Sequence, residues 1–284
     1  MLTSRNIQMS EKVFVVLRDI IYQRSGMFFP DNKKYVLETR LVRRVDDAGF
    51  ESFEKYVDFL KSDPKREQEL SALFEIITTN ETSFFRDMNQ LQVFEAGVLT
   101  KLIKQIEGTG VKKLRLWSSA CSTGEEPYTM AMQTLNRVQT GINSDWDIEI
   151  HATDISEGVL NSARRGEYND YSIRNVPPQY LAKYFSKNGN GKYSIKPEIK
   201  KLVKFSNVNL FDSMKLRVFK GMHIVFCRNV LIYFDEASKK KVVNSIYDSL
   251  LPGGYLFIGH AESLFNISRA FKLVNMNNLL VYQK

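Results

Sequence analysis

The sequence Leu114-Arg-Leu-Trp-Ser118-Ser-Ala-Cys-Ser-Thr-Gly-Glu-Glu-Pro-Tyr128 joins a short apolar run to a loop of small residues. The apolar run has the length of a buried strand. Gly124 permits a tight turn, and Pro127 suits the first turn of a helix that we expect to continue to residue 138. A strand, a tight turn and a helix in this order predict an α/β domain.

Short apolar runs alternate with helical segments through most of the chain beyond this point. Apolar strands joined by helices predict a doubly wound, mostly parallel sheet. Strands are expected at residues 114–117, 148–153, 202–206, 223–227 and 255–259, and helices at 127–138, 157–165 and 236–251. An antiparallel hairpin is expected at the sheet edge, at residues 271–274 and 279–282 around Asn277-Asn278.

Residues 168–204 interrupt this alternation. They contain Pro177-Pro178 and the glycine-rich turn Asn188-Gly-Asn-Gly191. Short segments at 184–186 and 192–195 flank the turn and are suited to pair as a hairpin. We therefore expect a small inserted antiparallel β subdomain on the rim of the sheet domain.

The first 87 residues carry no strand pattern. Apolar residues recur at helical spacing over 11–25, and cap and stop signals bound further helices at 33–48, after Ser52 and after Pro64. Another helical stretch spans 88–107. We expect an N-terminal helical domain with its linker at 1–87 and the sheet domain at 88–284.

The composition narrows the class of protein. The 284 residues carry a net charge of +8, which favours an acidic partner and leaves nucleic acid, anionic lipid and acidic protein surfaces open. The chain has two cysteines, which are too few for a disulfide framework or a structural zinc site. We assign its three histidines to strands and therefore expect no metal site. Without a long apolar run or a secretory signal, the protein is expected to stay in the cytoplasm, with no membrane insertion.

The loop after the first strand carries two carboxylates. Glu125 and Glu126 argue against a phosphate ligand, which binds bare N–H groups and cations. They suit a ligand with positive charge, such as S-adenosylmethionine with its ammonium and sulfonium. They equally suit the start of a helix, whose dipole they complement, so the loop alone leaves both interpretations open.

Polar residues follow the later strands. Asp154 ends the second strand, where a carboxylate can bind both ribose hydroxyls of an adenosine or can cap the next helix. Asn209 and Asn229 offer amide groups to the ligand or to buried structural partners. Tyr233 is either a site residue or a core aromatic.

The junction between the two domains reads Thr78-Thr-Asn-Glu-Thr-Ser-Phe-Phe-Arg-Asp87. It is dense in hydroxyl and amide side chains and lacks helical apolar spacing. The Phe84-Phe85 pair indicates a packed segment, which places Arg86 beside a hydrophobic anchor at the domain cleft.

Four segments in order resemble the chemotaxis receptor methyltransferases, the CheR family. They begin at Thr78, Ala120, Ala152 and Phe226 and read TTNETSFFR, ACSTGEEPY, ATDI and FCRNVLIYF. The resemblance spans almost the whole chain. It implies the fold of S-adenosylmethionine-dependent methyltransferases, with S-adenosylhomocysteine as product and receptor glutamates as acceptors. It assigns cofactor contacts to Asn80, Thr82, Arg86, Glu125, Asp154, Asn209, Leu210, Arg228 and Asn229, and it places Arg86 and Tyr233 beside the reacting groups.

A basic face on the helix at 33–48 carries Arg40, Arg43 and Arg44. It is either a solvated face or a docking surface, and the resemblance favours docking to the acidic cytoplasmic helical bundles of chemoreceptors. A basic helix also suits an RNA backbone, although we do not expect a nucleic-acid partner. The short turn at 187–191 favours an enzyme that needs no receptor tether, and we expect a monomer.

Two other functions share these features. The first is a methyltransferase acting on RNA or another substrate, because a fold does not fix a substrate. The second is a non-catalytic signalling module that senses the cofactor. A glutamyl methyl ester is labile to mild alkali and a methylated base nitrogen is not, so the product separates the first alternative from a protein-glutamate methyltransferase.

Overall fold

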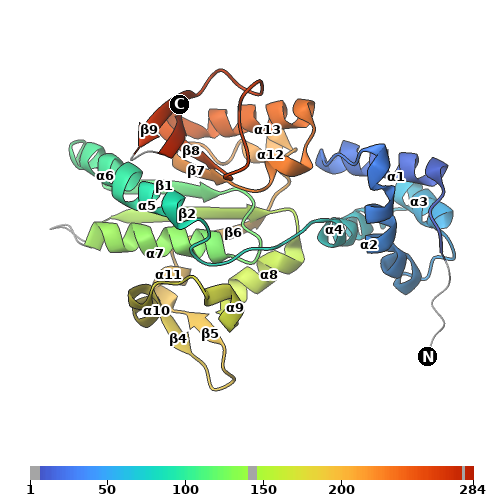
Figure 1. Cartoon of the computed structure of the whole chain (residues 1–284), viewed down its shortest axis with the longest axis horizontal. Coiled ribbons are helices and arrows are strands. Elements are labelled where there is room, and N and C mark those ends of the chain that lie inside the picture. The colour runs from blue at the N-terminus through green and yellow to red at the C-terminus, as the bar shows by residue number, and fades with distance from the viewer. Residues whose placement is uncertain (1–6, 140–145, 277–278) are drawn as a thin grey trace.

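The computed structural model describes residues 7–139, 146–276 and 279–284 of the chain. A helical N-terminal domain packs beside a larger sheet domain, and a small second sheet projects from the latter (Figure 1). The described residues contain no helix that is both long and apolar enough to cross a membrane.

The N-terminal domain consists of four α-helices around a core of its own. Ser10 caps α1 and Ser52 caps α3, each by accepting a hydrogen bond from the backbone N–H three residues ahead. Leu17, Leu41 and Tyr56 are fully buried between the helices. The helices are α1 (Glu11–Ser25), α2 (Lys34–Asp47, after the short η1 at Asp31–Lys33), α3 (Phe53–Ser62) and α4 (Arg66–Ile77).

The central sheet has seven strands in the order β6-β2-β1-β7-β8-β10-β9. The first five are parallel, and β10 and β9 add an antiparallel edge, as the sequence predicted. The strands are β1 (Lys113–Ser118), β2 (Asp147–Asp154), β6 (Val203–Asn207), β7 (Met222–Cys227), β8 (Leu250–Ile258), β9 (Lys272–Met276) and β10 (Leu279–Gln283).

Helices cover both faces of this sheet (Figure 1). Along β1, Leu116 faces one core and Trp117 faces the other, because successive side chains of a strand point to opposite faces. Segments α5 (Met88–Gln92), η2 (Val93–Leu99), α6 (Thr100–Glu107) and α7 (Glu125–Gln139) pack on the first face, and α12 (Ser213–Leu216) and α13 (Glu236–Ser249) on the second. The doubly wound prediction is confirmed.

The chain reverses direction across the sheet at β1. From β1 it proceeds to β2 and β6, and it then returns to β7 on the other side of β1. Ligands bind outside the carboxyl ends of the strands at such a switch point. Ser118, Asp154 and Cys227 are the last residues of β1, β2 and β7, so the loops that follow them converge at one edge of the sheet.

The inserted subdomain is a three-stranded antiparallel sheet in the order β3-β5-β4. The predicted hairpin is present as β4 and β5, whereas the two-residue β3 had no sequence signal. Its strands and helices are β3 (Glu167–Tyr168), α9 (Asp170–Ile173), α10 (Pro178–Tyr184), β4 (Phe185–Lys187), β5 (Tyr193–Ile195) and α11 (Pro197–Lys200), and it follows α8 (Glu157–Arg165).

Among the differences from the predicted ranges, one helix ends early and one histidine lies outside a strand. The helix expected to reach residue 251 ends at Ser249, and β8 begins at Leu250 with extended backbone, since Pro252 cannot continue a helix. His260, expected in a strand, lies in a turn beyond β8. The turn proposed at Asn277-Asn278 lies outside the described residues.

A charged cluster lies across β1, β2 and β6, at one side of the sheet. In it, the Arg115 Nε atom lies 3.0 Å from Glu149 Oε2, and the Lys204 ammonium also binds Glu149. The Lys204 hydrogen bond, with the neighbouring positive charges, lowers the pKa of Glu149 to about 2. His151 contacts the Arg115 guanidinium at 3.3 Å, and burial lowers the pKa of this imidazole.

We predict that His151 makes stability fall in mild acid. Folding lowers the pKa of the imidazole below its ordinary value of 6.5, so the unfolded state binds more protons there as the pH falls. His151→Gln should therefore lose less unfolding free energy than wild type between pH 7.5 and 5.5, measured by urea denaturation. One proton changes the slope by at most about 1.4 kcal/mol per pH unit. The difference in unfolding free energy between His151→Gln and wild type at pH 8 reports the effects of the substitution other than protonation. An equal pH dependence of the unfolding free energy in both proteins would contradict this prediction.

Candidate active site

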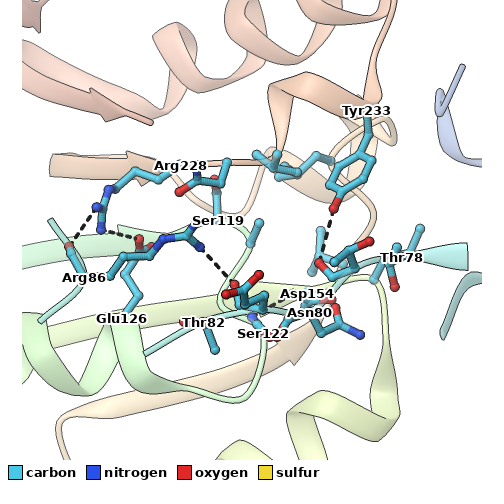
Figure 2. A pocket seen from close by; sticks show the side chains of 18 of the residues that line it. Thr78, Asn80, Thr82, Arg86, Ser119, Ser122, Glu126, Asp154, Arg228 and Tyr233 are labelled. Atoms are coloured by element: carbon cyan, nitrogen blue, oxygen red, sulfur yellow. Dashed lines mark hydrogen bonds and ion pairs between the residues drawn. The ribbon is translucent and has the colours of Figure 1, made fainter. Parts of the chain in front are cut away.

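A cleft lies beyond the carboxyl ends of β1, β2 and β7, where the linker from the helical domain crosses the sheet edge (Figure 2). The empty space in and in front of it is about 1000 Å³, which includes open solvent at its mouth. Its walls come from the linker, from the loops after the three strands, and from Ser25 and Met27 of the helical domain.

The loop after β1 closes the floor of the cleft. Ser122 donates its backbone N–H to Asp154 at 2.9 Å and its hydroxyl to the carbonyl of Asn80 at 3.1 Å. Gly124 has a φ of 96°, and a Cβ there would lie 2.8 Å from the Cβ of Ala163. The glycine is therefore required both by the turn and by the close approach of α8.

Asp154 is not the cap of the next helix, because Ser156 is the N-cap of α8 and accepts the N–H of Val159. The Asp154 carboxylate accepts the N–H of Ser122 and, at 3.0 Å, the N–H of Ser156 ahead of α8. It also lines the cleft at the end of β2, where it is buried. Burial raises its pKa, and the two backbone donors oppose that rise. One residue thus anchors two loops and presents a carboxylate to the cleft.

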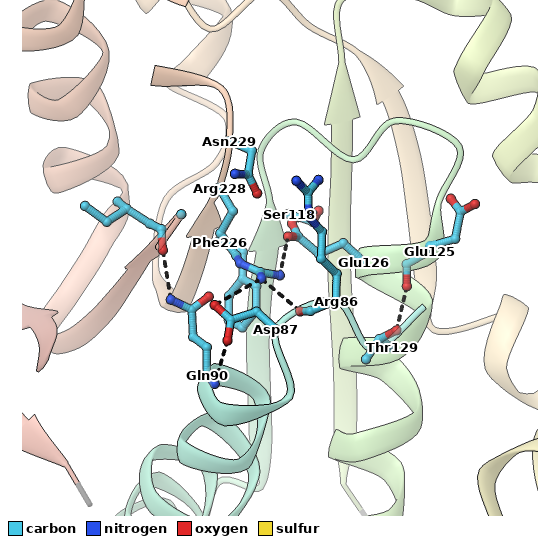
Figure 3. Close-up of polar contacts among 12 residues, drawn as sticks. Arg86, Asp87, Gln90, Ser118, Glu125, Glu126, Thr129, Phe226, Arg228 and Asn229 are labelled. Carbon is cyan, nitrogen blue, oxygen red and sulfur yellow. Dashed lines mark hydrogen bonds and ion pairs between the residues drawn. The ribbon is translucent and has the colours of Figure 1, made fainter. Parts of the chain in front are cut away.

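The two adjacent glutamates of this loop point in different directions (Figure 3). Glu126 lines the cleft and accepts a hydrogen bond of 2.7 Å from Ser118. Glu125 is buried beneath the loop, where it accepts hydrogen bonds from Thr123 at 2.6 Å and Ser172 at 3.2 Å. Glu125, to which the family resemblance assigns a cofactor contact, is not among the residues that line the cleft.

Arg228 lines the cleft and forms a buried ion pair with Glu126. Its Nη1 atom lies 3.1 Å from Glu126 Oε2, and its Nη2 atom donates to the carbonyl of Arg86 at 2.9 Å. Burial raises the pKa of Glu126, and the Arg228 charge opposes the rise. The Nε atom of Arg228 has no hydrogen-bond partner among the described protein groups. A polar ligand group in the cleft is the natural partner for such an atom.

Arg86 and Tyr233 both line the cleft, and each is bound to the linker. The Arg86 guanidinium is exposed and donates to the carbonyl of Glu81 at 2.9 Å. The Tyr233 hydroxyl donates to the carbonyl of Thr79 at 3.2 Å. Asn80 and Thr82 also line the cleft. The linker therefore contributes its backbone and its side chains to the site.

The phenylalanine pair fixes this linker in place. Phe84 is fully buried, and its ring packs edge-on against Tyr168 with the ring centroids 4.7 Å apart. Phe85 is buried too, with a φ of 53° that is rare for an aromatic residue. These two buried rings belong to a turn just before Arg86 and hold it at the cleft, as the sequence predicted for a packed segment.

The polar residues after β6 and β7 also reach the cleft. Asn209 and Leu210 line it, but the Asn209 amide already donates to the carbonyl of Arg24 at 2.6 Å and accepts from the N–H of Phe211. Asn209 thus joins the helical domain to the sheet domain. Asn229 lines the cleft with a left-handed φ of 57°.

The helical domain contributes a wall that the sequence did not reveal. Met27 forms an isolated antiparallel bridge to Phe234, and the N–H of Phe28 donates to the carbonyl of Tyr233 at 2.9 Å. Gly26 ends α1 in a left-handed conformation, directly against the ring of Phe211. Neither the pattern of α1 nor that of the later strands signals this pairing, because it joins segments about 200 residues apart.

The three basic residues of α2 have different surroundings. Arg40 donates to the carbonyl of Ile77 and, at 2.9 Å, to the hydroxyl of Thr79 in the linker. Arg44 binds the buried carboxylate of Glu69 with 2.8 Å between Nε and Oε1. Arg43 projects outward with 90% of its side chain exposed. Of these three arginines, Arg43 is the exposed one, and its Nε atom lies 3.6 Å from Asp47 Oδ2 on the same helix.

Comparison with known families identifies the class of protein to which this chain belongs. The family model described as "CheR methyltransferase, SAM binding domain" matches residues 80–280, and the model described as "CheR methyltransferase, all-alpha domain" matches residues 12–78. The chain belongs to the CheR methyltransferase family. It is accordingly an S-adenosylmethionine-dependent methyltransferase.

Relatives match this CheR-family enzyme along nearly its full length. It is 36% identical over 278 residues to "Chemotaxis protein methyltransferase 2" of Vibrio cholerae, covering 98% of this chain and 94% of that protein. It is 36% identical to a chemotaxis protein methyltransferase of Borreliella burgdorferi, covering 91% and 90% respectively. It is 34% identical to "Chemotaxis protein methyltransferase 1" of Pseudomonas aeruginosa, covering 95% and 97% respectively.

The residues of the cleft fit S-adenosylmethionine. The Asp154 carboxylate stands at the end of β2, where a ribose binds in doubly wound folds. The Glu126 carboxylate lines the same cleft, and Arg228, which also lines it, has an unpartnered donor. A cleft with both carboxylates and a spare cationic donor suits a ligand that carries positive groups and a carboxylate.

Proposed function

We propose that this CheR-family enzyme methylates glutamate side chains in the cytoplasmic helical bundles of chemoreceptors. The names of its relatives support chemotaxis as the context. The single observation that carries the chemical class of acceptor is the exposed Arg86 guanidinium at the mouth of the cleft. A chemoreceptor acceptor implies that the enzyme acts in the cytoplasm. Since the two domains of one chain supply the described cleft, we propose that it acts as a monomer.

An ionised acceptor removes the need for a general base. A glutamate has an unperturbed pKa of about 4.3, so at neutral pH it is already a carboxylate nucleophile. No histidine, cysteine or lysine is among the described residues that line the cleft. When bound, S-adenosylmethionine supplies a methyl group on a sulfonium, with a neutral thioether as leaving group. Alignment of the two reactants can then supply roughly 7–11 kcal/mol of the catalysis.

We assign the cofactor side of the cleft to its buried polar residues. Asp154 binds the ribose hydroxyls, and Arg228 offers its free Nε–H to the amino-acid part. Glu126 provides the carboxylate that faces the ligand, while Glu125 acts through the loop that it anchors. The remaining cofactor contacts fall to Asn80, Thr82, Arg86, Asn209, Leu210 and Asn229.

We assign the acceptor side to Arg86 and Tyr233. Arg86 binds the acceptor carboxylate through its guanidinium, which can form two parallel hydrogen bonds. Tyr233 is fixed by its bond to the Thr79 carbonyl and lines the path to the acceptor. Both are held by the linker, so the geometry of acceptor and cofactor depends on the same short segment.

The helical domain with its linker, residues 1–87, is the proposed receptor-docking domain. Arg43 lies on the exposed face of α2 with Tyr35 and Thr39, which are spaced four residues apart and also exposed. Arg40 and Arg44 contribute to this surface mainly by fixing α2 to the linker and to α4. The exposed stripe offers one aromatic ring and one exposed cation, which is paired with Asp47 at 3.6 Å, to an acidic helix.

We predict that Arg43→Glu weakens receptor docking. An exposed ion pair contributes up to about 1 kcal/mol, so KM for a receptor cytoplasmic fragment should rise about fivefold with little change in kcat. The effect should shrink at high ionic strength. Arg217→Glu is the matched control, because it reverses another exposed arginine, at the end of α12. If both variants have the same KM, α2 is not the docking surface.

The direct test of the proposed function is the fate of labelled methyl. Transfer to a receptor cytoplasmic fragment, in a form that mild alkali releases, supports a glutamyl methyl ester. Label that remains on the protein after alkali would contradict it.

A further inference from the structure

Glu262 lies in the turn after β8 and gathers three backbone N–H groups at one carboxylate. Its Oε2 atom accepts from Gly259 at 2.6 Å and from Asn229 at 2.9 Å, and its Oε1 atom accepts from Leu231 at 2.8 Å. Hydrogen bonds to a charged acceptor are stronger than neutral ones. This one side chain therefore ties the loop after β7 to the end of β8.

The surrounding backbone leaves room for this carboxylate. A Cβ on Gly259 would lie 2.7 Å from Glu262 Oε2 and 2.9 Å from the N atom of Asn229. Asn229 itself has a φ of 57°, a left-handed conformation that costs energy in a residue other than glycine. Such a conformation persists when the surrounding contacts hold it, and Glu262 provides such contacts at the N–H of Asn229 itself and at that of Leu231.

The residues held in this way face the reaction site. Asn229 lines the cleft and also an adjoining hollow that contains Arg86 and His260. Leu231 begins the short helix η3 (Leu231–Tyr233), which carries Tyr233 into the cleft. Glu262 does not line the cleft itself. Its effect on the reaction therefore passes through the backbone that it holds.

We propose that Glu262 is a positioning residue that sets the conformation of the Asn229–Tyr233 segment for cofactor binding and methyl transfer. The inference rests on the proposed role of Asn229 in cofactor binding. It predicts that losing one acceptor atom at Glu262 weakens the site without removing any group that touches the ligand.

The test compares Glu262→Gln with Glu149→Gln. In Glu262→Gln an amide NH₂ replaces one acceptor oxygen and faces a backbone N–H, so at least one of the three bonds is lost. Glu149 is a matched carboxylate in the same domain, bound by Arg115 and Lys204 and absent from the cleft lining. Each variant is measured for its thermal midpoint, for Kd of S-adenosylhomocysteine by calorimetry, and for kcat and KM with a receptor fragment.

We expect the Kd of Glu262→Gln for S-adenosylhomocysteine to rise about tenfold, the loss of one hydrogen bond to a charged group. Its kcat should fall as well, because Tyr233 moves with the segment. Glu149→Gln should lose thermal stability and keep the wild-type Kd. Wild-type Kd and kcat in Glu262→Gln would overturn the proposal, as would a Kd that rises equally in both variants.

Asn229→Ala distinguishes this inference from the site assignment. If Asn229→Ala weakens cofactor binding and Glu262→Gln does not, the positioning inference alone fails. If neither weakens it, the assignment of Asn229 fails first. If Glu262→Gln does not fold, amide hydrogen exchange in the wild-type enzyme still decides: Asn229 and Leu231 should be strongly protected, and rapid exchange at both would overturn the proposal.

Discussion

Arg86→Ala is expected to lower kcat roughly 100-fold, in the range seen when one preorganised donor is removed from an active site. The side chain is exposed and, among the described residues, its one hydrogen bond goes to the carbonyl of Glu81, so little folding energy depends on it. The phenylalanines before it stay buried and keep the linker in place. The loss should therefore appear in turnover and leave the unfolding free energy within about 0.5 kcal/mol of wild type.

Single-turnover methylation of a receptor fragment, with urea denaturation of the same preparations, checks this prediction. Arg86→Lys keeps the charge but not the two-pronged geometry, so it should recover only part of the rate. Arg217→Ala is the control for removing an exposed arginine. Normal turnover in Arg86→Ala would remove Arg86 from the proposed acceptor site.

Asp154→Ala is expected to raise the Kd for S-adenosylhomocysteine roughly 100-fold. Each hydrogen bond to a charged group contributes about 1.5–3 kcal/mol, and the carboxylate is proposed to bind two ribose hydroxyls. The same change leaves the N–H groups of Ser122 and Ser156 without their acceptor, so the loops on both sides of the cleft lose an anchor. Stability should fall as well, by about 1–3 kcal/mol.

Asp212→Ala separates the two effects. Asp212 also accepts two backbone N–H groups, those of Met214 and Lys215, and does not line the cleft. It should lose stability without losing cofactor affinity. Asp154→Asn, which keeps one acceptor oxygen, should bind more tightly than Asp154→Ala. Calorimetric titration of the three variants gives the answer, and equal Kd values for Asp154→Ala and wild type would refute the ribose assignment.

The sheet domain was predictable because its signals are local. The apolar runs at 114–117 and 148–153 have strand length, and Gly124 and Pro127 mark the turn and helix between them. Parallel order follows from the alternation of strands and helices. The residues at strand ends could therefore be placed at one edge of the sheet before any distance was known.

The directions of individual side chains were not predictable in the same way. Glu125 and Glu126 are adjacent and chemically alike. The geometry of the loop determines that Glu126 lines the cleft and that Glu125 binds Thr123 and Ser172. On α2, spacing placed Arg40 and Arg44 on the basic face, but their partners Thr79 and Glu69 come from other segments. Such contacts depend on tertiary packing, which the helical period does not encode.

Contacts between segments that are distant in the sequence were the least predictable part of the site. Met27 pairs with Phe234, and Glu262 binds the backbone of Asn229, without any motif that announces the pairing. A hydrogen bond between two backbone groups, as in the Met27–Phe234 bridge, does not depend on the side chains of either residue, so the sequence does not mark it. A lone glutamate after a strand reads as a surface residue until the loop that it holds is seen beside it.

The most direct measurement is methyl transfer from labelled S-adenosylmethionine to a chemoreceptor cytoplasmic fragment, followed by mild alkali and mapping of the labelled residue. The account predicts label on glutamate side chains of the helical bundle, released as methanol by alkali, with an initial rate that falls roughly 100-fold in Arg86→Ala. Transfer to RNA or to an alkali-stable position, or no transfer by an enzyme that binds the cofactor, would contradict it.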